Sequence, residues 1–349
     1  MFALVAPTHD GVPTGGHVYN EHLLREWEAN GVPVVLARVQ GQWPHPSTTQ
    51  RARLHATLTR YPVVLLDGLV GAGCPDEVAA AESVGTRVVI LVHLPLPAEP
   101  GLTAAEQARL ADCEERALQV ASGVVATSSW AARDLHRRYR LGQVAVALPG
   151  ADQAAVSVGS TPPHLLVLAA FTPGKNHATL LRALERLEDL AWTAAFVGRR
   201  AAGIAAQAWE RRAGASPVRG RVEVPGPLVG PALEREWSRT DLLVLPSRVE
   251  TFGLVVTEAL AHGIPAVVGA GTGAVEALVG DGLTPPPGAA ADPSDPDALA
   301  AAIRSFLADP HVRVGWRRHA LARRKQLRPW SETAREVLAT LPSNARPGE

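Results

Sequence analysis

The sequence contains little lysine, little cysteine and no excess of charge. Among its 349 residues, 34 are basic and 34 are acidic, and only two of the basic residues, Lys175 and Lys325, are lysines. The absence of a surplus of positive charge argues against a protein that binds nucleic acid through bulk electrostatics. The two cysteines, Cys74 and Cys113, are too few for a disulfide framework or a zinc site, and they favour a reducing compartment.

Long hydrophobic runs are absent as well. No apolar segment reaches the roughly 18 residues that a membrane-spanning helix needs, and the N-terminal apolar run is too short for a signal peptide. We therefore expect a cytoplasmic protein, with peripheral membrane contact left open. The composition, 46% hydrophobic and 19% charged residues, is globular, and a chain of this length is expected to form about two domains.

Short apolar segments alternate with longer amphipathic segments along the chain. The expected strands are residues 2–6, 32–37, 62–66, 87–92, 123–127, 164–170, 193–197, 221–224, 241–245 and 265–269. The expected helices are residues 17–30, 103–121, 129–139, 177–190, 231–239, 253–262, 296–308 and 330–341. This alternation is typical of α/β folds in which helices cover both faces of a parallel sheet.

The alternating pattern occurs twice, and a polar, proline-bearing segment at residues 149–163 separates the two copies. We predict two Rossmann-like domains, with a loop at the proline- and glycine-rich residues 280–296. Ligands of such sheets bind at the carboxyl ends of the strands, so a cleft between the two domains is the expected site.

The most informative segment is residues 241–268. A strand is followed by a turn and by a helix that begins near Gly253, which directs unpaired backbone N–H groups towards the ligand edge of the sheet. The N–H groups of residues 252–254 are therefore candidates to hold an anionic or polyhydroxy ligand. Glu250 and Glu258 flank this helix start, and on one continuous helix their offset corresponds to about 12 Å. The two glutamates are suited to contacting two parts of one elongated ligand.

These residues resemble the Glu–seven–Glu element of the retaining GT-B glycosyltransferases of family 4, also called glycosyltransferase group 1. In that family, the first glutamate and the following N–H groups hold the donor sugar, and the second glutamate binds the nucleotide ribose. The resemblance implies donor-binding roles for Glu250, Thr251, Phe252, Gly253, Leu254 and Glu258, and a catalytic one for Glu250.

The resemblance also implies the GT-B fold, in which two Rossmann-like domains face each other across a cleft. Residues 1–157 would form the acceptor-side domain and residues 158–329 the donor domain. A C-terminal helix, within about residues 330–349, would pack back on the N-terminal domain.

A second element, residues 171–181 (FTPGKNHATLL), is similar to the proline–x–lysine–glycine–histidine segment of the family. The lysine of that segment contacts the donor diphosphate, and Lys175 takes its place here. A compact ammonium group at this point would neutralise the charge that develops as the bond between sugar and phosphate breaks. Lys175 is therefore expected to be catalytic.

The chain departs from the family at two positions near this lysine. Ala170 stands where many members carry an arginine, and Asn176 replaces the commoner glycine. One diphosphate contact would then be missing, and Arg199 or Arg248 would have to supply it. We count Gly198 and Arg199 among the expected donor-binding residues.

A third element follows the first strand, where Gly15 and Gly16 precede a helix. Glycines at such a turn let backbone amides approach phosphates, and the family has a phosphate-binding glycine loop at this place. His93, at the carboxyl end of residues 87–92, matches a family histidine near the reacting sugar, and we expect it to be catalytic. The acceptor-side candidates are His9, Asp10, Tyr19 and Asn20.

Several further side chains are expected to support the fold. Ser128 and Ser129 are interpreted first as helix caps. His177 and His262 are interpreted as structural or surface residues. Glu276, which matches a third glutamate of the family, is as suited to supporting the fold as to contacting a ligand.

The leading hypothesis is a retaining glycosyltransferase that needs neither a cofactor nor a metal, because no Asp–x–Asp element lies at a suitable place. Its co-substrates would be a nucleotide-diphosphate sugar and an unidentified hydroxyl acceptor. A GT-B sugar-nucleotide epimerase, and a catalytically weak nucleotide-sugar-binding partner motivated by Ala170, remain open. A dinucleotide oxidoreductase is disfavoured, because no G-x-G-x-x-G follows the first strand.

Overall fold

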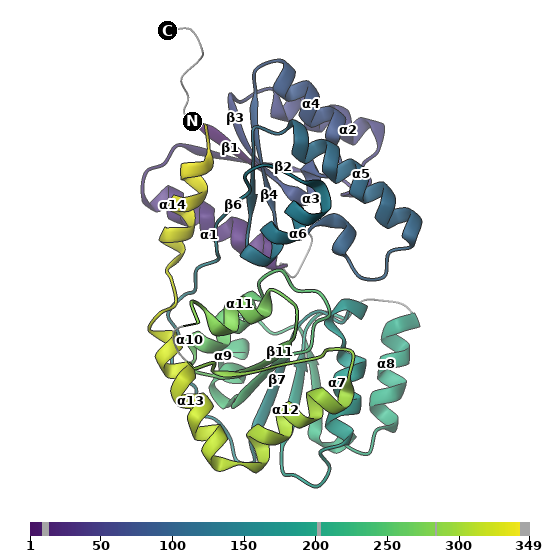
Figure 1. Ribbon diagram of the computed structural model, residues 1–349, viewed down its shortest axis with the longest axis vertical. Coiled ribbons are helices and arrows are strands. Elements are labelled where there is room, and N and C mark those ends of the chain that lie inside the picture. Colours follow the sequence, from purple (N-terminus) through teal and green to yellow (C-terminus); the bar gives the residue numbers. More distant parts are fainter. Residues whose placement is uncertain (9–13, 201–203, 283–284, 343–349) are drawn as a thin grey trace. The chain divides into compact units, whose positions relative to one another are not determined.

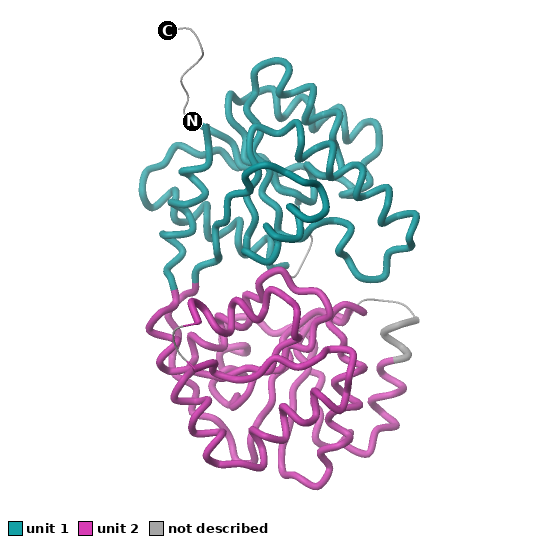
Figure 2. The backbone as a smooth tube through the Cα atoms, viewed as in Figure 1, with its two compact units in different colours: residues 1–150, 328–349 teal, residues 151–327 magenta. Residues whose placement is uncertain are grey.

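The computed structural model describes residues 1–8, 14–200, 204–282 and 285–342. The chain divides into two compact units (Figure 2): unit 1 comprises Met1–Gly150 and Arg328–Glu349, and unit 2 comprises Ala151–Leu327. The boundary predicted from the sequence lies further on, after residue 157. Residues 151–157 belong to unit 2 instead. Ser157, for example, donates its hydroxyl hydrogen to the carbonyl oxygen of Thr240 in unit 2, at an Oγ–O distance of 2.6 Å.

Unit 1 contains a parallel sheet with the strand order β2-β1-β3-β4-β5-β6 among its described residues (Figure 1). The strands are β1 (Phe2–Pro7), β2 (Val34–Val39), β3 (Val63–Asp67), β4 (Arg87–Val92), β5 (Gly123–Ala126) and β6 (Ala145–Val146). Every residue of β1 and β3 is buried, which is why β1 and the first four residues of β3 read as apolar runs in the sequence.

Helices cover this sheet on both faces, as the strand–helix alternation predicts (Figure 1). They are α1 (Gly15–Ala29), α2 (Thr48–Leu58), α3 (Gly68–Gly71), α4 (Pro75–Ser83), the 3₁₀ turn η1 (Leu96–Ala98), α5 (Ala104–Val120), α6 (Ser129–Tyr139) and α14 (Trp330–Thr340). α2 and α4 were not predicted. Both are short, and their low apolar content gives a weak helical pattern.

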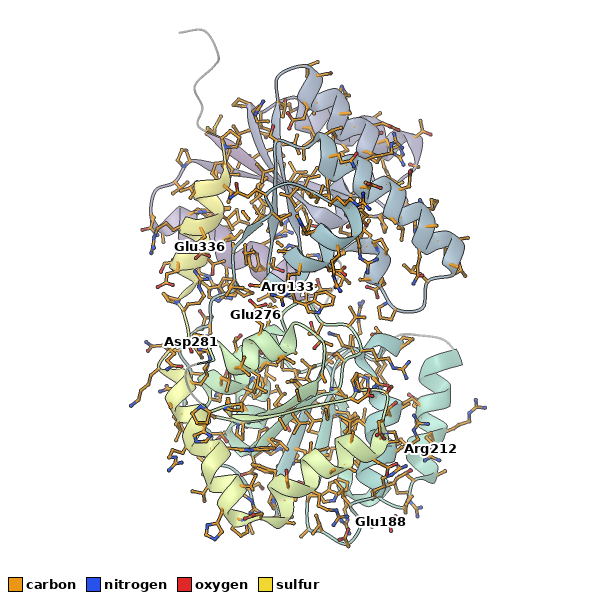
Figure 3. All side chains as sticks on the ribbon, viewed as in Figure 1. Arg133, Glu188, Arg212, Glu276, Asp281 and Glu336 are labelled. Carbon is orange, nitrogen blue, oxygen red and sulfur yellow. The ribbon has the colours of Figure 1, made fainter. Side chains whose placement is uncertain are left out.

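The last helix, α14, returns to unit 1. The indole Nε1 of Trp27 on α1 donates to the carbonyl oxygen of Ala334 at 3.0 Å, and His22 stacks on Trp330 with ring centroids 4.2 Å apart. Glu336 on α14, labelled in Figure 3, pairs at 2.6 Å with Arg328, which precedes the helix. The predicted packing of the C-terminal helix on the N-terminal domain is confirmed.

Unit 2 contains a second parallel sheet, with the order β12-β11-β10-β7-β8-β9 in the described part of the chain. Its strands are β7 (His164–Leu168), β8 (Thr193–Val197), β9 (Val222–Gly226), β10 (Leu242–Leu245), β11 (Ala266–Gly269) and β12 (Gly288–Ala291). Its helices are η2 (Pro173–Lys175), α7 (His177–Glu185), α8 (Ile204–Ala215), η3 (Arg219–Arg221), α9 (Pro231–Arg239), α10 (Leu254–Ala261), α11 (Ala274–Val279), α12 (Pro296–Ala308) and α13 (Pro310–Arg324).

The edge strand β12 corrects one prediction, because residues 288–291 lie in the segment that was expected to be a loop. A Cβ atom at Gly288 would lie 1.8 Å from the carbonyl oxygen of Ala266, so only glycine allows this close pairing with β11. The remaining residues of β12 are alanines, which carry little strand signal. The strand therefore forms because it pairs with β11, and its own residues have little preference for a strand.

No helix among the described residues is both long and apolar enough to cross a membrane.

Candidate active site

An ion pair in unit 2 joins the two residues predicted to act on the sugar and the diphosphate. Nζ of Lys175 lies 2.5 Å from Oε2 of Glu250. Lys175 ends η2, which follows β7, and Glu250 follows β10. β7 and β10 are neighbours in the parallel sheet, so their carboxyl ends meet at one edge. Both side chains keep access to solvent, with exposed fractions of 29% and 14%.

Next to this ion pair, the backbone of residues 251–254 presents its N–H groups without acceptors in the described part of the chain. Gly253 has a φ angle of +82°, a left-handed conformation that glycine adopts at no steric cost. Phe252 anchors the turn because its ring is buried. Leu254 then begins α10, so the N–H groups and the positive end of the helix dipole together form an anion-binding arrangement.

The turn that carries Glu250 is supported from behind by the start of α11. Gly273 donates its N–H to the carbonyl oxygen of Glu250 at 2.7 Å. A Cβ atom at Gly273 would lie 1.7 Å from the carbonyl oxygen of Thr251, so the two segments approach as closely as only glycine permits. Glu276, labelled in Figure 3, lies one turn further along α11. This support fixes the backbone from which Glu250 projects.

Asn176 departs from the family glycine, and the structure explains how it is accommodated. Its φ angle is +60°, the left-handed region in which asparagine is the best tolerated residue after glycine. Its buried amide Nδ2 donates to the carbonyl oxygen of Pro246 at 3.1 Å and also to that of Pro293. Oδ1 accepts from Thr179 Oγ1 at 2.7 Å. The side chain thus joins the turn at residues 173–176, here called the lysine turn, to the segments that follow β10 and β12.

Glu258, on the second turn of α10, is half-buried, and its side-chain carboxylate has no hydrogen-bond partner among the residues that the structure describes. Burial, and then the nearby carboxylates of Asp152 and Glu234, raise the pKa of Glu258 to about 7. A carboxylate left unpaired in this way is available to accept hydrogen bonds from a ligand.

The remaining predicted donor-binding residues of unit 2 lie at the end of β8. A Cβ atom at Gly198 would lie 2.0 Å from the carbonyl oxygen of Ala169, so glycine is required where the ends of β8 and β7 meet. The carbonyl oxygen of Arg199 accepts the N–H of Phe171 at 2.9 Å. The side chains of Arg199 and Arg248 are exposed, and neither guanidinium has a partner within the described ranges.

In unit 1, the predicted residues Gly16, Asn20 and His93 come together around a residue that the sequence reasoning missed, Asp67. Nε2 of His93 lies 3.1 Å from Oδ1 of Asn20 and 3.5 Å from Oδ2 of Asp67. Nδ2 of Asn20 donates to the same Asp67 oxygen at 2.7 Å. A Cβ atom at Gly16 would lie 3.0 Å from Cδ2 of His93, so the start of α1 touches the imidazole ring.

Asp67 is the last residue of β3, directly after four buried apolar residues. Burial alone would raise its pKa, but hydrogen bonds from His93, Asn20 and the backbone N–H of Leu69 outweigh that effect and lower the pKa of Asp67. The signal was present in the sequence, because an acid that ends a buried strand next to β4 lies at the same sheet edge as His93.

The other acceptor-side candidates have different outcomes. Tyr19 is buried, with its ring centroid 5.3 Å from that of His93, and its hydroxyl donates to the carbonyl oxygen of Ala147 at 2.9 Å. Gly15, which was predicted to bind the donor, is the first residue of α1. His9 and Asp10 lie outside the described residues.

Residues interpreted as structural behave accordingly. Ser128 caps α6, with Oγ accepting from the N–H of Ala131 at 2.9 Å. His177 is buried and stacks on Phe171, and burial lowers the pKa of His177 to about 4. Nδ1 of His262 lies 2.7 Å from the carbonyl oxygen of Ala155. In the described ranges, no group of three or more histidine, cysteine, aspartate or glutamate side chains is arranged to hold a metal ion.

Comparison with known proteins identifies the family to which the chain belongs. Residues 151–325 match the family described as "Glycosyl transferases group 1". A GDP-mannose-dependent alpha-(1-6)-phosphatidylinositol dimannoside mannosyltransferase of Mycobacterium tuberculosis is 33% identical over 139 residues. That match covers 37% of this chain and 34% of the mannosyltransferase, so it spans about a third of that relative. A D-inositol 3-phosphate glycosyltransferase of Xylanimonas cellulosilytica is 29% identical over 250 residues, covering 64% of this chain and 58% of the relative.

Solved structures match over almost the whole chain. HepE of Anabaena, crystallised with UDP and glucose, has a TM-score of 0.75 at 18% identity, covering 97% of this chain and 99% of that chain. Sucrose-phosphate synthase of Thermosynechococcus elongatus has a TM-score of 0.75 at 20% identity, covering 97% of both chains. These likenesses confirm the predicted GT-B fold. Since the family model also matches half of the sequence, this chain belongs to the group 1 glycosyltransferases.

Proposed function

We propose that this protein is a retaining glycosyltransferase of the family 4 type, which transfers a sugar from a nucleotide-diphosphate sugar to an acceptor hydroxyl without a metal ion. The observation that carries the proposal is the Lys175–Glu250 ion pair beside the unpaired N–H groups of residues 251–254. A cation, a carboxylate and a row of N–H groups at one sheet edge are the groups that a sugar diphosphate requires.

Each group has a distinct part in this proposal. Lys175 stabilises the diphosphate as negative charge develops on it, because a fixed ammonium group costs no solvent reorganisation during the reaction. Glu250 accepts hydrogen bonds from the donor sugar and orients it, with the N–H groups of Phe252, Gly253 and Leu254 on the same ligand. Glu258, whose carboxylate lacks a protein partner, accepts hydrogen bonds from the ribose hydroxyls.

Unit 1 supplies the acceptor side in this proposal, with His93 lining the reaction centre and the glycine pair at Gly15 and Gly16 contacting the donor phosphates. Diphosphate contacts from Gly198 and Arg199 belong to the same proposal. The departing phosphate takes the acceptor proton, so no dedicated carboxylate base is required. Retention of the anomeric configuration follows if attack and departure share one face of the sugar.

The class of donor is supported by what the relatives carry. The mycobacterial relative is named as GDP-mannose-dependent, and the HepE crystals contain UDP and glucose. We propose a nucleoside diphosphate sugar for this chain on that basis, with the base and the sugar to be identified by experiment. A cytoplasmic location is proposed as well, because Cys74 and Cys113 are free thiols.

The proposal is tested by incubating the protein with UDP-, GDP- and ADP-sugars, with and without a panel of hydroxyl acceptors, while nucleotide release is followed. We expect acceptor-dependent release from one donor, with activity retained after treatment with EDTA, and a product whose anomeric configuration by proton NMR matches the donor. Conversion of the sugar without any acceptor would instead indicate an epimerase. Binding of a donor without turnover over the whole panel would indicate a nucleotide-sugar-binding partner.

A further inference from the structure

The hydrogen bonds around His93 determine which of its ring nitrogens carries a proton. The two polar contacts of Nε2 are with oxygens, Oδ1 of Asn20 at 3.1 Å and Oδ2 of Asp67 at 3.5 Å. Neither oxygen can donate a hydrogen bond when Asp67 is ionised. An unprotonated Nε2 would therefore place its lone pair against two acceptors. A proton on Nε2 is donated to Oδ1 of Asn20 and also faces the negative charge of Asp67.

The orientation of the Asn20 amide follows from Asp67. One carboxylate oxygen of Asp67 accepts the N–H of Leu69 at 2.9 Å, and the other accepts Nδ2 of Asn20 at 2.7 Å. If the amide were reversed, its carbonyl oxygen would face the carboxylate, and two buried acceptors would lose their hydrogen bonds at a cost of about 1–3 kcal/mol each. The ionised carboxylate thus orients Asn20, and Asn20 in turn presents an acceptor to His93.

The other ring nitrogen of His93, Nδ1, has no hydrogen-bond partner among the described residues. The imidazole is also held in place from its sides, by the start of α1 at Gly16 and by the edge of the Tyr19 ring. Its side chain remains 18% exposed, whereas that of Asp67 is 5% exposed. Nε2 of His93 is therefore occupied by Asn20 and Asp67, whereas Nδ1 remains available to a ligand.

We propose that Asp67 and Asn20 are positioning residues that hold His93 in the tautomer protonated on Nε2, so that Nδ1 accepts a hydrogen bond from a hydroxyl group of the substrate. The inference rests on the proposed function, because it takes the substrate to be a sugar. It assigns a direction to the contact: His93 is an acceptor towards the sugar and does not donate to a phosphate oxygen. Uncharged hydroxyl groups are the chemical class that such a nitrogen selects.

The first test needs no substrate, so it is independent of the proposed function. The full chain is labelled with ¹⁵N-histidine and studied by NMR at pH 8, above the ordinary histidine pKa of about 6.5, and the His93 signals are assigned with His93→Gln. We expect Nε2 to be protonated and Nδ1 unprotonated. Replacing Asn20 by leucine should accelerate exchange of the Nε2 proton with water about tenfold, the loss of one hydrogen bond. A ring protonated on Nδ1 would overturn the proposal.

The second test locates the hydroxyl group once a donor is known. Donor analogues in which each hydroxyl is replaced in turn by fluorine, which cannot donate, are compared with wild-type protein and His93→Ala. We expect one analogue to lose about fivefold in kcat/KM with the wild type and nothing further with His93→Ala. If no donor analogue behaves in this way, an acceptor analogue fluorinated at one hydroxyl should do so. If the effect of fluorination is independent of His93 in both series, the proposed contact with the substrate is contradicted.

Asp67→Asn provides the variant that separates positioning from packing, because it keeps the shape and removes the charge that orients Asn20. We expect about a fivefold loss in kcat, measured at a temperature well below the thermal midpoints of both proteins. Asp134→Asn is the matched control, since Asp134 is also buried in unit 1 but pairs with Arg138 at 2.6 Å on α6. Equal losses in the two variants would mean that Asp67 acts only through stability.

Discussion

The side-chain amide of Asn176 donates to the carbonyl oxygen of Pro246, 3.1 Å away, and so ties the lysine turn to the segment that leads to Glu250. A second tie is made by the backbone, because the N–H of Arg248 donates to the carbonyl oxygen of Gly174 at 2.9 Å. The 2.5 Å distance between Lys175 and Glu250 is therefore set by a buried framework in addition to their own attraction. An exposed ion pair alone would hold these side chains weakly.

Asn176→Gly should separate this framework from the backbone conformation. Glycine keeps the positive φ angle but removes the buried hydrogen bonds to Pro246 and Pro293. We expect a lower thermal midpoint, corresponding to about 1–3 kcal/mol, and a decrease in kcat as the lysine turn loosens. Asn176→Ala should be less stable still, because alanine must also bear the cost of the left-handed conformation, about 1 kcal/mol. Calorimetry of the two variants gives the comparison, and equal midpoints would refute this assignment.

Gly16→Ala should reduce activity without reducing stability. The added Cβ atom would lie 3.0 Å from Cδ2 of His93, closer than an ordinary contact, so the imidazole must move. The helix itself should gain up to about 1 kcal/mol, because alanine is the better helix former. Turnover and thermal unfolding are measured together.

The matched control for Gly16→Ala is Gly214→Ala. Gly214 also lies in a helix, α8, and a Cβ atom there meets nothing within 4 Å. The control should keep full turnover. A Gly16→Ala variant that turns over as fast as this control would show that the close approach to His93 has no functional role.

Glu258 should make the ligand-free protein less stable as the pH rises. Its pKa in the folded chain is raised to about 7 from the ordinary glutamate value of 4.5, so folding favours its protonated form. Its stabilising contribution is full below about pH 4.5 and is lost as the pH rises through about 7. Glu258→Gln removes this dependence.

The thermal midpoint of Glu258→Gln should therefore exceed that of wild type at pH 8, while the difference shrinks or vanishes near pH 5. The same variant should bind the donor more weakly, because the ribose loses a charged acceptor. Glu188→Gln, at an exposed position, is the control and should show no such pH-dependent difference. A constant difference between Glu258→Gln and wild type from pH 5 to pH 8 would rule out the assignment.

Much of the fold could be predicted from the sequence, because the buried parallel strands leave a distinct record. β3 and β4 contain the apolar runs 63–66 and 88–92, and their lengths were predicted to within a residue. β12 could not be predicted in the same way, since its three alanines have no strand preference and its pairing depends on Gly288 lying against β11. Such a strand is recognisable only after the sheet that it joins is known.

The candidate site shows the same limit. The residues of the Glu250 turn could be proposed from the sequence because the roles predicted for them depend on local sequence, a strand followed by a glycine turn and a helix. Asp67 was missed because its role depends on contacts with Asn20, 47 residues away, and with His93. The Asn176 substitution appeared to be a defect in the motif, whereas the fold gives its side chain three hydrogen-bond partners.

Of the two lysines, Lys325 provides a control for the predicted role of Lys175. Lys175 contacts Glu250 at the sheet edge, whereas Lys325 follows α13 and is exposed. Lys175→Ala and Glu250→Ala should each reduce turnover by about 100-fold or more, the scale of losing one transition-state contact. Lys325→Ala removes the same charge and should leave turnover unchanged.

The most direct measurement is therefore the rate of nucleotide release from the donor that the panel identifies, compared for wild type, Lys175→Ala, Glu250→Ala and Lys325→Ala. The account predicts a loss of about 100-fold or more in the first two variants and none in the third. Wild-type rates in both Lys175→Ala and Glu250→Ala would contradict it.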